Sequence, residues 1–267
     1  MPKISLAKIN PESTPLCTDK DQGLKQLQKY QKRIYELLYL MFAEDRRSLL
    51  IILHGIDTSG KDGVVKFIFD SANPQGIQVH SFKKPSDEEL KHDFLWRCHK
   101  VTPGSGGTSI FNRSYYEEVT VARVHPEILK SQHLPPEVLT DNAFIKKRYQ
   151  QINDFEYMLT NNGTTVLKFL LHITKAEQKQ RLKERLDDKT KNWKFSTGDI
   201  KERKYWNQYM KAFEQMIAGT NTKEAPWNVV PANKKWYRDL VIAKIIVEHL
   251  ESLKMKFPEV QKKPRID

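Results

Sequence analysis

The residues best suited to chemistry lie in a glycine-rich loop that follows an apolar run. The run 49–53 is followed by Gly55, Gly60 and Lys61 in the spacing Gly-x4-Gly-Lys, and a helical pattern begins directly behind them. In this order of strand, loop and helix, glycines let backbone N–H groups face phosphate oxygens, while the helix dipole and the lysine add positive charge. A chance match in a surface loop is the alternative, but the flanking patterns favour a phosphate-binding loop (P-loop).

One position of this loop departs from the usual pattern. A Ser or Thr normally follows the lysine and binds Mg²⁺ through its hydroxyl, whereas Lys61 is followed by Asp62. Another oxygen must therefore hold the metal. Asp57, inside the loop, is the obvious candidate, and we expect it to bind Mg²⁺, with Mn²⁺ as an alternative ion.

Charged and amide side chains follow two further strands of the predicted sheet. Lys83 follows the second strand, and Asn112, Arg113 and Glu117 follow the third. Ligands of parallel α/β sheets bind beyond the carboxyl ends of the strands, so these side chains should meet the P-loop at one cleft.

A strongly basic segment follows the fourth strand. Residues 175–204 contain eleven Lys or Arg and six Asp or Glu, a local charge of +5, and Arg181 and Arg185 lie four apart on one helix face. A solvated helix face is the alternative explanation of such a charge run. The position directly after a strand, opposite the P-loop, favours a lid whose cations, Arg181 and Arg185 among them, contact transferring phosphates.

Hydrophobic periodicity indicates the elements that position these residues. We expect strands at 49–53, 77–82, 108–111, 164–173 and 227–231. We expect helices at 21–44, behind the P-loop, at 86–99, at 141–159, behind Thr174, at 196–218 and at 234–253, with 126–140 irregular. Strands that alternate with helices at this spacing predict one α/β domain of three layers around a five-stranded parallel sheet.

Composition narrows the class of protein. The 267 residues include 45 Lys or Arg and 33 Asp or Glu, a net charge of +12, which favours a polyanionic partner: nucleic acid, an anionic membrane surface or a phosphate-rich substrate. The two cysteines are too few for a disulfide framework. No signal-peptide core and no run of eighteen apolar residues is present, so we expect a cytoplasmic protein without membrane spans.

Seven short motifs together resemble the polyphosphate kinase 2 family, over about residues 23–250. They are Gly55-Ile56-Asp57-Thr58-Ser59-Gly60-Lys61-Asp62-Gly63, Asn73-Pro74-Gln75-Gly76, Phe94-Leu95-Trp96-Arg97, Phe111-Asn112-Arg113-Ser114-Tyr115-Tyr116-Glu117, Arg185-Leu186-Asp187-Asp188, Trp193-Lys194-Phe195-Ser196 and Pro231-Ala232-Asn233-Lys234-Lys235-Trp236-Tyr237-Arg238. The resemblance implies Mg²⁺-dependent, reversible phosphoryl transfer between inorganic polyphosphate and adenine or guanine nucleotides. It also implies a thymidylate-kinase-like P-loop fold with a helical lid, in dimers or tetramers.

The resemblance assigns roles to individual positions. Asp57 matches the metal-binding carboxylate, Lys61 the P-loop lysine, and Arg113 a phosphate clamp; further phosphate contacts are implied for Arg123, Arg185 and Lys194. We expect an N-terminal arm at 1–22, the kinase domain at 23–255 with its lid at about 181–205, and a C-terminal tail at 256–267.

Asn112 departs from many members of the family, which have Asp at this position. The Asn form resembles the subgroup said to phosphorylate both nucleoside monophosphates and diphosphates, so we expect both AMP and ADP as acceptors. The amide oxygen of Asn112 can still bind the metal, with less charge than a carboxylate. Alternatively, Asn112 caps the helix that follows it.

Two other functions remain open from the sequence. An ATP-dependent nucleoside monophosphate kinase is the nearest, because Lys83, Asn112 and Arg113 lie where thymidylate kinases bind their acceptor, with Glu117 close by. A donor of many phosphates needs a longer cationic track than ATP, and the net charge with the basic lid favours polyphosphate. A nucleic-acid-binding protein with a vestigial P-loop is disfavoured, because no nucleic-acid recognition motif is found.

Overall fold

All five predicted strands are present and form one parallel sheet. The computed structural model describes residues 4–70 and 73–259. The strands are β1 (Ser48–His54), β2 (Ile77–Ser81), β3 (Thr108–Asn112), β4 (Thr164–His172) and β5 (Trp227–Pro231). They lie in the order β2-β3-β1-β4-β5, and every neighbouring pair is parallel. The carboxyl ends of all five strands therefore reach the same edge of the sheet, and the predicted α/β fold is confirmed.

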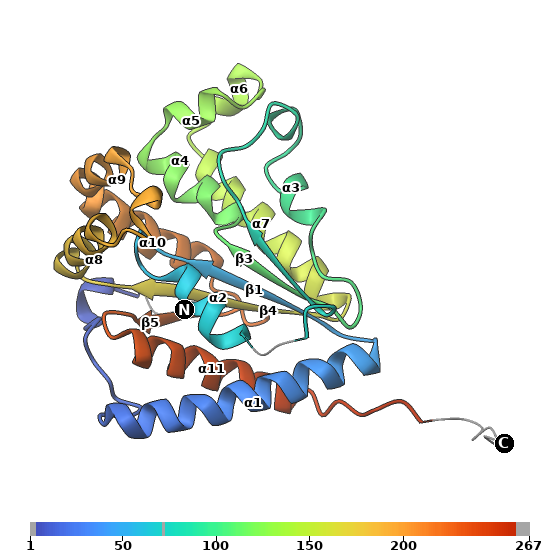
Figure 1. The fold of residues 1–267 in the computed structure, drawn as a ribbon. Helices are drawn as coiled ribbons and strands as arrows, with labels where there is room; N and C mark the ends of the chain where they lie inside the picture. Colours follow the sequence, from blue (N-terminus) through green and yellow to red (C-terminus); the bar gives the residue numbers. More distant parts are fainter. Residues whose placement is uncertain (1–3, 71–72, 260–267) are drawn as a thin grey trace.

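Helices cover both faces of the sheet, as predicted for three layers (Figure 1). One face carries α1 (Lys20–Glu44), α2 (Lys61–Phe69) and α11 (Lys235–Ser252), and the other carries α4 (Val121–Val124), α7 (Phe144–Asn161) and α10 (Trp206–Thr220). All seven residues of β1 are buried, which explains why its sequence is a continuous apolar run.

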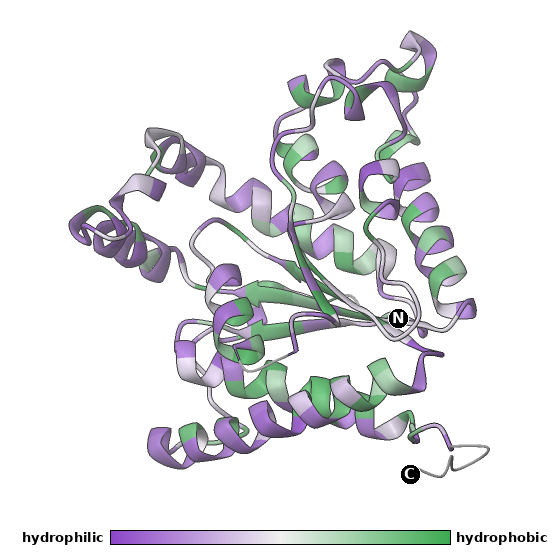
Figure 2. Ribbon diagram, turned by 45° about the vertical axis from the view of Figure 1, so that its right-hand side comes forward, coloured by the Kyte–Doolittle hydropathy of each residue, from purple (hydrophilic) through white to green (hydrophobic). Residues whose placement is uncertain are grey.

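The predicted lid projects from the side of this body (Figure 1). It consists of α8 (Lys175–Asp187), the 3₁₀ helices η4 (Asn192–Lys194) and η5 (Arg203–Tyr205), and α9 (Thr197–Glu202) between them. Figure 2 shows the strands mostly hydrophobic and these lid helices mostly hydrophilic. The single helix expected at 196–218 is thus divided at η5 into α9 and α10.

Two further expectations about helices are corrected. The segment 86–99 forms only η2 (Glu89–Lys91) and α3 (Trp96–His99). Ser86 and Glu89 form reciprocal hydrogen bonds, a capping box, at the start of this segment. The carboxylate of Asp93 then accepts hydrogen bonds from the backbone N–H groups of Leu95 and Trp96, which interrupts the helix. The segment 126–140, expected to be irregular, contains α5 (Glu127–Lys130) and α6 (Pro136–Leu139).

The two ends of the chain pack against the body. The N-terminal segment contains η1 (Leu6–Lys8), and α1 begins at Lys20 with Asp19 as its N-cap, inside the region expected to be an arm. In the C-terminal segment Met255 is buried. Residues 1–3 of the expected arm and 260–267 of the expected tail lie outside the described residues. Within the described ranges, no helix is long and apolar enough to cross a membrane.

Candidate active site

The P-loop joins β1 to α2 and has the backbone expected of an anion cradle. Gly55 and Gly60 have φ angles of 143° and 104°, a region in which side chains are strained. The ammonium group of Lys61 donates to the carbonyl oxygens of Gly55 (2.7 Å) and Ile56 (3.3 Å), so it lies across the loop. Burial, and then the nearby Arg113, lower the pKa of Lys61. Phosphate oxygens bound at this loop would therefore add negative charge beside a buried ammonium group that donates to two backbone carbonyls.

Arg181 holds the P-loop from behind instead of facing a ligand. Its five N–H groups are all used: Nε donates to Glu177, Nη1 to the carbonyls of Thr58 and Ser59, and Nη2 to the carbonyls that follow β5, at Ala232 and Asn233. Only 6% of Arg181 is exposed. The structure therefore gives no support to the expected contact of Arg181 with phosphate, because all of its donors are used within the protein.

A second buried guanidinium group packs under the same loop. Arg238 donates to both carboxylate oxygens of Asp239, at 2.8 and 2.9 Å. A methyl group on Gly60 would lie 2.0 Å from Arg238 Nη1, so the close approach of the loop to this guanidinium requires glycine. Two buried arginines, Arg181 and Arg238, therefore support the P-loop on the side opposite its expected ligand.

Arg113 lies directly beyond the end of β3 and faces the P-loop. Its Nη2 donates to Asp57 Oδ1 at 2.6 Å, and its φ of 66° is unusual for a residue with a side chain. Burial opposes ionisation of Arg113, but the carboxylates of Glu117 and Asp57 outweigh it and raise the pKa of the guanidinium. Arg113 therefore stays charged at the mouth of the anion cradle.

The lid contacts the residue directly behind the P-loop lysine through one of the predicted cations, Lys194, whereas Arg185 pairs within the lid. Lys194 Nζ lies 3.0 Å from Asp62 Oδ2, and Arg185 Nη1 lies 3.2 Å from Asp199 Oδ2. Burial raises the pKa of Asp199, and the nearby Asp57 raises it further. Lys194 therefore lies at the P-loop, Arg185 is held inside the lid, and their contact with phosphate stays a prediction.

Asn112 contacts the same P-loop carboxylate. Its Nδ2 donates to Asp62 Oδ1 at 2.7 Å. Burial acts to raise the pKa of Asp62, but the hydrogen bonds from Asn112 and Lys194 outweigh it and lower this pKa. The helix that follows β3, η3 (Tyr115–Val119), is capped by Ser114, whose Oγ accepts from the backbone of Tyr116. The alternative role of Asn112 as a helix cap is therefore wrong.

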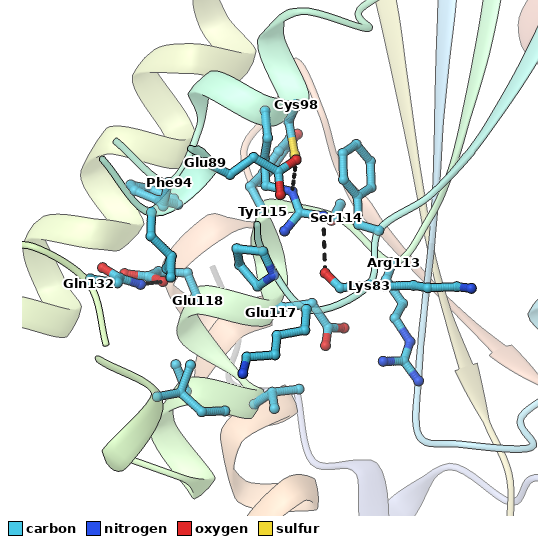
Figure 3. Close-up of a pocket in the computed structure, with 18 of the residues that line it drawn as sticks. Lys83, Glu89, Phe94, Cys98, Arg113, Ser114, Tyr115, Glu117, Glu118 and Gln132 are labelled. Atoms are coloured by element: carbon cyan, nitrogen blue, oxygen red, sulfur yellow. Dashed lines mark hydrogen bonds and ion pairs between the residues drawn. The ribbon is translucent and has the colours of Figure 1, made fainter. Parts of the chain in front are cut away.

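A cavity of about 370 Å³ opens beside Arg113 (Figure 3). The side chains of Lys83, Arg113 and Glu117 lie at one end of it, and Glu118, Gln132 and Phe94 lie at the other. Apolar side chains also line it, namely Phe82, Leu90, Val121 and Ile128. A cavity with cations at one end and apolar walls suits a molecule that joins phosphate to a flat, less polar group.

A second cavity, of about 300 Å³, lies on the P-loop side of Arg113. Its lining includes Asp57, Arg113 and Glu117, together with the buried His54. Burial lowers the pKa of His54 to about 3, so this imidazole is neutral. Arg113 and Glu117 line both cavities and therefore stand between the P-loop and the cavity that contains Lys83.

Arg123 is the one predicted phosphate contact that lies apart from these groups. It is on α4, its Nη1 donates to the hydroxyl of Tyr149 on α7 at 3.2 Å, and it lines neither of the two cavities. The structure therefore gives no support to a phosphate contact by Arg123.

The donor set at the P-loop suits a hard, hydrated cation. Among the described residues, no three His, Cys, Asp or Glu side chains gather as a metal site. Mg²⁺ does not need such a cage, because it keeps several waters and takes one or two protein oxygens together with substrate phosphates. The partly exposed carboxylate of Asp57 and the amide oxygen of Asn112, left over when its Nδ2 binds Asp62, fit that requirement.

Sequence reasoning missed two carboxylates at this site. In the sequence, Asp62 is apparent only as the replacement of a hydroxyl, and nothing in the local pattern marks Asp199. Asp62 is held by two residues from distant parts of the chain, Asn112 and Lys194, and Asp199 is held by Arg185 of the neighbouring lid helix. The charge run at 175–204 contains Asp199, but its excess of Lys and Arg indicates phosphate-binding cations and does not single out a carboxylate.

Known proteins resemble this chain over almost its whole length. A family model described as polyphosphate kinase 2 matches residues 17–258. The ADP-polyphosphate phosphotransferase of Rhodopseudomonas palustris is 42% identical over 96% of this chain and 89% of its own length. The AMP/ADP-polyphosphate phosphotransferase of Meiothermus ruber is also 42% identical, over 96% of this chain and 92% of its own length.

Solved structures agree with these sequence matches. The crystal structure of polyphosphate kinase 2 from Arthrobacter aurescens is 42% identical, covers 98% of this chain and 90% of its own, and has a TM-score of 0.90. One from Pseudomonas aeruginosa, described as a putative polyphosphate kinase 2, is 30% identical with a TM-score of 0.82, over 93% of this chain and 51% of its own. With the P-loop, Arg113 and the basic lid in place, the chain belongs to the polyphosphate kinase 2 family.

Proposed function

We propose that this protein transfers a phosphoryl group from inorganic polyphosphate to nucleoside mono- and diphosphates, converting AMP to ADP and ADP to ATP, reversibly and with Mg²⁺. The position of Arg113 carries the proposal, because this cation lines both the cavity beside the P-loop and the cavity that contains Lys83. It can therefore contact donor and acceptor phosphates together. The names of the two relatives that are 42% identical support the same donor and acceptors.

The side chains supply charge and position, which is most of what phosphoryl transfer needs. A phosphate oxygen of the acceptor attacks the terminal phosphorus of polyphosphate, the bond to the bridging oxygen breaks, and the chain leaves one phosphate shorter. Lys61 and the P-loop amides hold the donor end. Arg113 neutralises charge on the transferring group, and Lys83 holds the acceptor phosphate in the larger cavity. Arg185 and Lys194 close over the donor from the lid.

The metal would be held by Asp57, with the amide oxygen of Asn112 beside it. Mg²⁺ at this place would supply positive charge to the phosphate oxygens, and Mn²⁺ has similar preferences for oxygen ligands. When Asp57 binds a metal, its ion pair with Arg113, now 2.6 Å, would loosen and free the guanidinium for phosphate.

One assay tests the proposed function against its nearest alternative. Purified protein is mixed with Mg²⁺ and AMP, ADP, GMP or GDP, with polyphosphate or ATP as the donor, and products are resolved by chromatography. We expect ADP and ATP from polyphosphate and AMP, and loss of product when the metal is chelated. Product from ATP and AMP, but none from polyphosphate, would instead show a nucleoside monophosphate kinase.

Three further expectations stay predictions, one from the family resemblance and two from the sequence pattern. We propose that the protein is a homo-oligomer, a dimer or a tetramer, which light scattering of the purified protein tests. We also propose that it is cytoplasmic and binds no specific nucleic acid. Cell fractionation tests the cytoplasmic location. Competition of a defined DNA site against random DNA tests whether the protein binds any specific sequence.

A further inference from the structure

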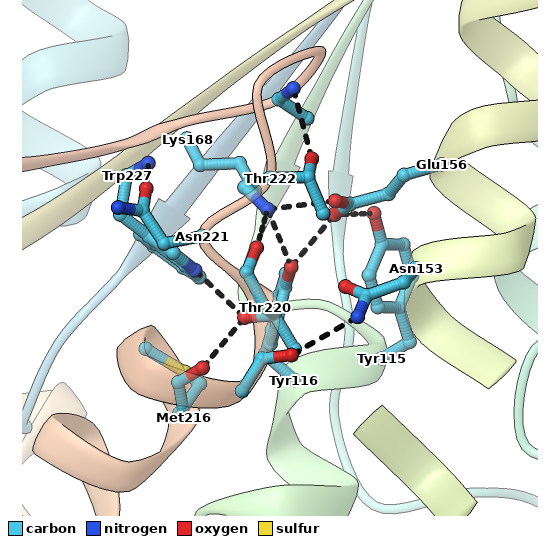
Figure 4. A network of polar contacts seen from close by, with 12 residues as sticks. Tyr115, Tyr116, Asn153, Glu156, Lys168, Met216, Thr220, Asn221, Thr222 and Trp227 are labelled. Carbon is cyan, nitrogen blue, oxygen red and sulfur yellow. Dashed lines mark hydrogen bonds and ion pairs between the residues drawn. The ribbon is translucent and has the colours of Figure 1, made fainter. Parts of the chain in front are cut away.

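A fully buried ion pair lies behind the active site (Figure 4). Lys168 of β4 and Glu156 of α7 are 0% and 1% exposed, and Lys168 Nζ lies 2.7 Å from Glu156 Oε2. Lys168 also donates to the hydroxyl of Tyr116 (2.9 Å) and to the carbonyl of Thr220 (2.7 Å), so each of its three N–H groups has an acceptor. A charge at this depth is costly unless it is fully paired, and here the pairing is complete.

Two tyrosines connect this ion pair to the active site. The hydroxyls of Tyr115 and Tyr116 both donate to Glu156 Oε1, at 2.8 and 2.7 Å. They are the first two residues of η3, which begins two residues after Arg113 and contains Glu117. We call Tyr115, Tyr116, Glu156, Lys168 and Thr220 the Glu156 network. The Glu156 network holds η3, which follows Arg113 and contains Glu117, while β3 holds the chain that precedes Arg113.

The backbone of Arg113 explains why such fixing is needed. Its φ of 66° lies in the left-handed region, which is strained for a residue with a side chain and persists only where the surroundings impose it. On the side of the sheet, the N–H of Arg113 donates to the carbonyl of Leu53 at 3.2 Å. On the other side, Tyr115 and Tyr116 are almost completely buried and end in the Glu156 network. If the tyrosine hydroxyls lost their acceptor, Arg113 could relax toward an ordinary conformation and move its guanidinium.

We propose that Glu156 and Lys168 are positioning residues of the phosphoryl-transfer site, acting through Tyr115 and Tyr116 to hold Arg113 and Glu117 in place. The inference rests on the proposed function, because it assumes that Arg113 contacts the transferring phosphate. Stability alone does not explain the ion pair, since apolar residues of similar volume are often as stable in such a place. Apolar packing would, however, lack the directional bonds that select one position for η3.

Two variants remove the connection in different ways. Tyr115→Phe with Tyr116→Phe deletes the two hydroxyls and keeps the ion pair, whereas Glu156→Leu with Lys168→Met removes both charges together and leaves neither buried alone. We expect both variants to fold and to lose about 10- to 100-fold in kcat, because a displacement of about 1 Å at a reacting centre can cost 100-fold. Polyphosphate KM should change little, since the P-loop and lid are untouched. Ile34→Ala on α1, across the sheet, is the matched control for lost stability alone.

A double-mutant cycle shows whether the effect passes through Arg113. We expect an Arg113→Lys variant to keep measurable activity because it retains a cation, and in this background the network substitutions should cost much less in kcat than they do beside Arg113. Equal losses in both backgrounds, or a loss no larger than that of Ile34→Ala at equal fraction folded, would overturn the inference. Failure of the proposed function looks different, because the unmodified protein would then form no product from polyphosphate.

Discussion

The P-loop, with the lid helix α8 packed behind it, and the lid tip at residues 192–205 are held differently by the fold. Behind the P-loop, Arg181 gives five hydrogen bonds from a side chain that is 6% exposed. The lid tip reaches the loop through Lys194 and Asp62, whose side chains are 41% and 67% exposed. Buried, fully paired groups resist displacement, whereas exposed ion pairs contribute little and weaken in salt.

This difference fits the two tasks of a phosphotransferase. The reacting end of the donor must be held in one position, so the P-loop amides, Lys61 and Arg113 belong to the rigid part. A long polyanion must also be able to enter and leave, so the cation of the lid tip, Lys194, needs to separate from Asp62. Lys194 donates to Asp62, and we expect a phosphate of the donor to replace Asp62 as its partner when polyphosphate binds. Substitutions in the two regions should therefore have effects of different size and different kind.

The largest effect is expected in the rigid part. Lys61→Ala and Arg113→Ala each remove a cation that faces developing phosphoryl charge, which is worth roughly 3–4 kcal/mol in comparable sites. We expect kcat to fall at least 100-fold while the melting temperature changes little. Steady-state kinetics and thermal unfolding of each variant measure this. Near-normal turnover in a folded variant would contradict the roles of both residues.

The next effect separates two arginines on one helix. Arg181→Lys keeps the charge but leaves at least two acceptors without a donor, and each unpaired buried carbonyl costs about 1–3 kcal/mol. Arg185→Lys, four residues away, changes a partly exposed pair with Asp199 that is worth about 1 kcal/mol or less. We expect Arg181→Lys to lower the free energy of unfolding by about 2–4 kcal/mol and Arg185→Lys to leave it nearly unchanged. Urea unfolding of both variants measures these free energies. Equal decreases in the two variants would show that α8 does not anchor the P-loop.

These arginines also show what the sequence could and could not predict. The five strands, the P-loop and the place of Arg113 were predictable, because each depends on local pattern or on the rule that strand ends meet at one edge. Arg181 and Arg185 look alike in sequence, and only the packing of α8 on the P-loop separates them. Lys168 interrupts an apolar strand, but its partner Glu156 lies on a neighbouring helix at no diagnostic spacing. Contacts between distant elements were therefore the part that the sequence did not reveal.

A smaller effect should appear in the salt dependence of polyphosphate binding. Each phosphate contact releases about one condensed counterion, so Lys194→Gln should reduce the slope of log affinity against log salt by about 1. Nucleotide affinity should change little with salt. Lys191→Gln is the matched control, because Lys191 lies in the same loop but pairs with Asp188. Binding titrations at several salt concentrations measure the slopes, and equal changes in the two variants would place the polyphosphate track elsewhere.

The smallest effect is expected at Asn112, where the rigid part and the lid meet. Asn112 donates to Asp62, and Asp62 in turn binds Lys194. Asn112→Asp would replace this donor by a second carboxylate at nearly constant shape, so the two negative charges would repel each other and draw Lys194 or the metal closer. AMP and ADP bring different charge to this place, and we expect their kcat/KM ratio to change several-fold and the Mg²⁺ requirement to fall. The double variant Asp62→Asn with Asn112→Asp exchanges the two side chains and should restore a hydrogen bond between them. It therefore separates the effect of losing this hydrogen bond from the effect of the extra negative charge in Asn112→Asp. An unchanged acceptor ratio with unchanged Mg²⁺ dependence in Asn112→Asp would mean that Asn112 acts only in holding the loop to β3, and that acceptor choice is made elsewhere in the Lys83 cavity.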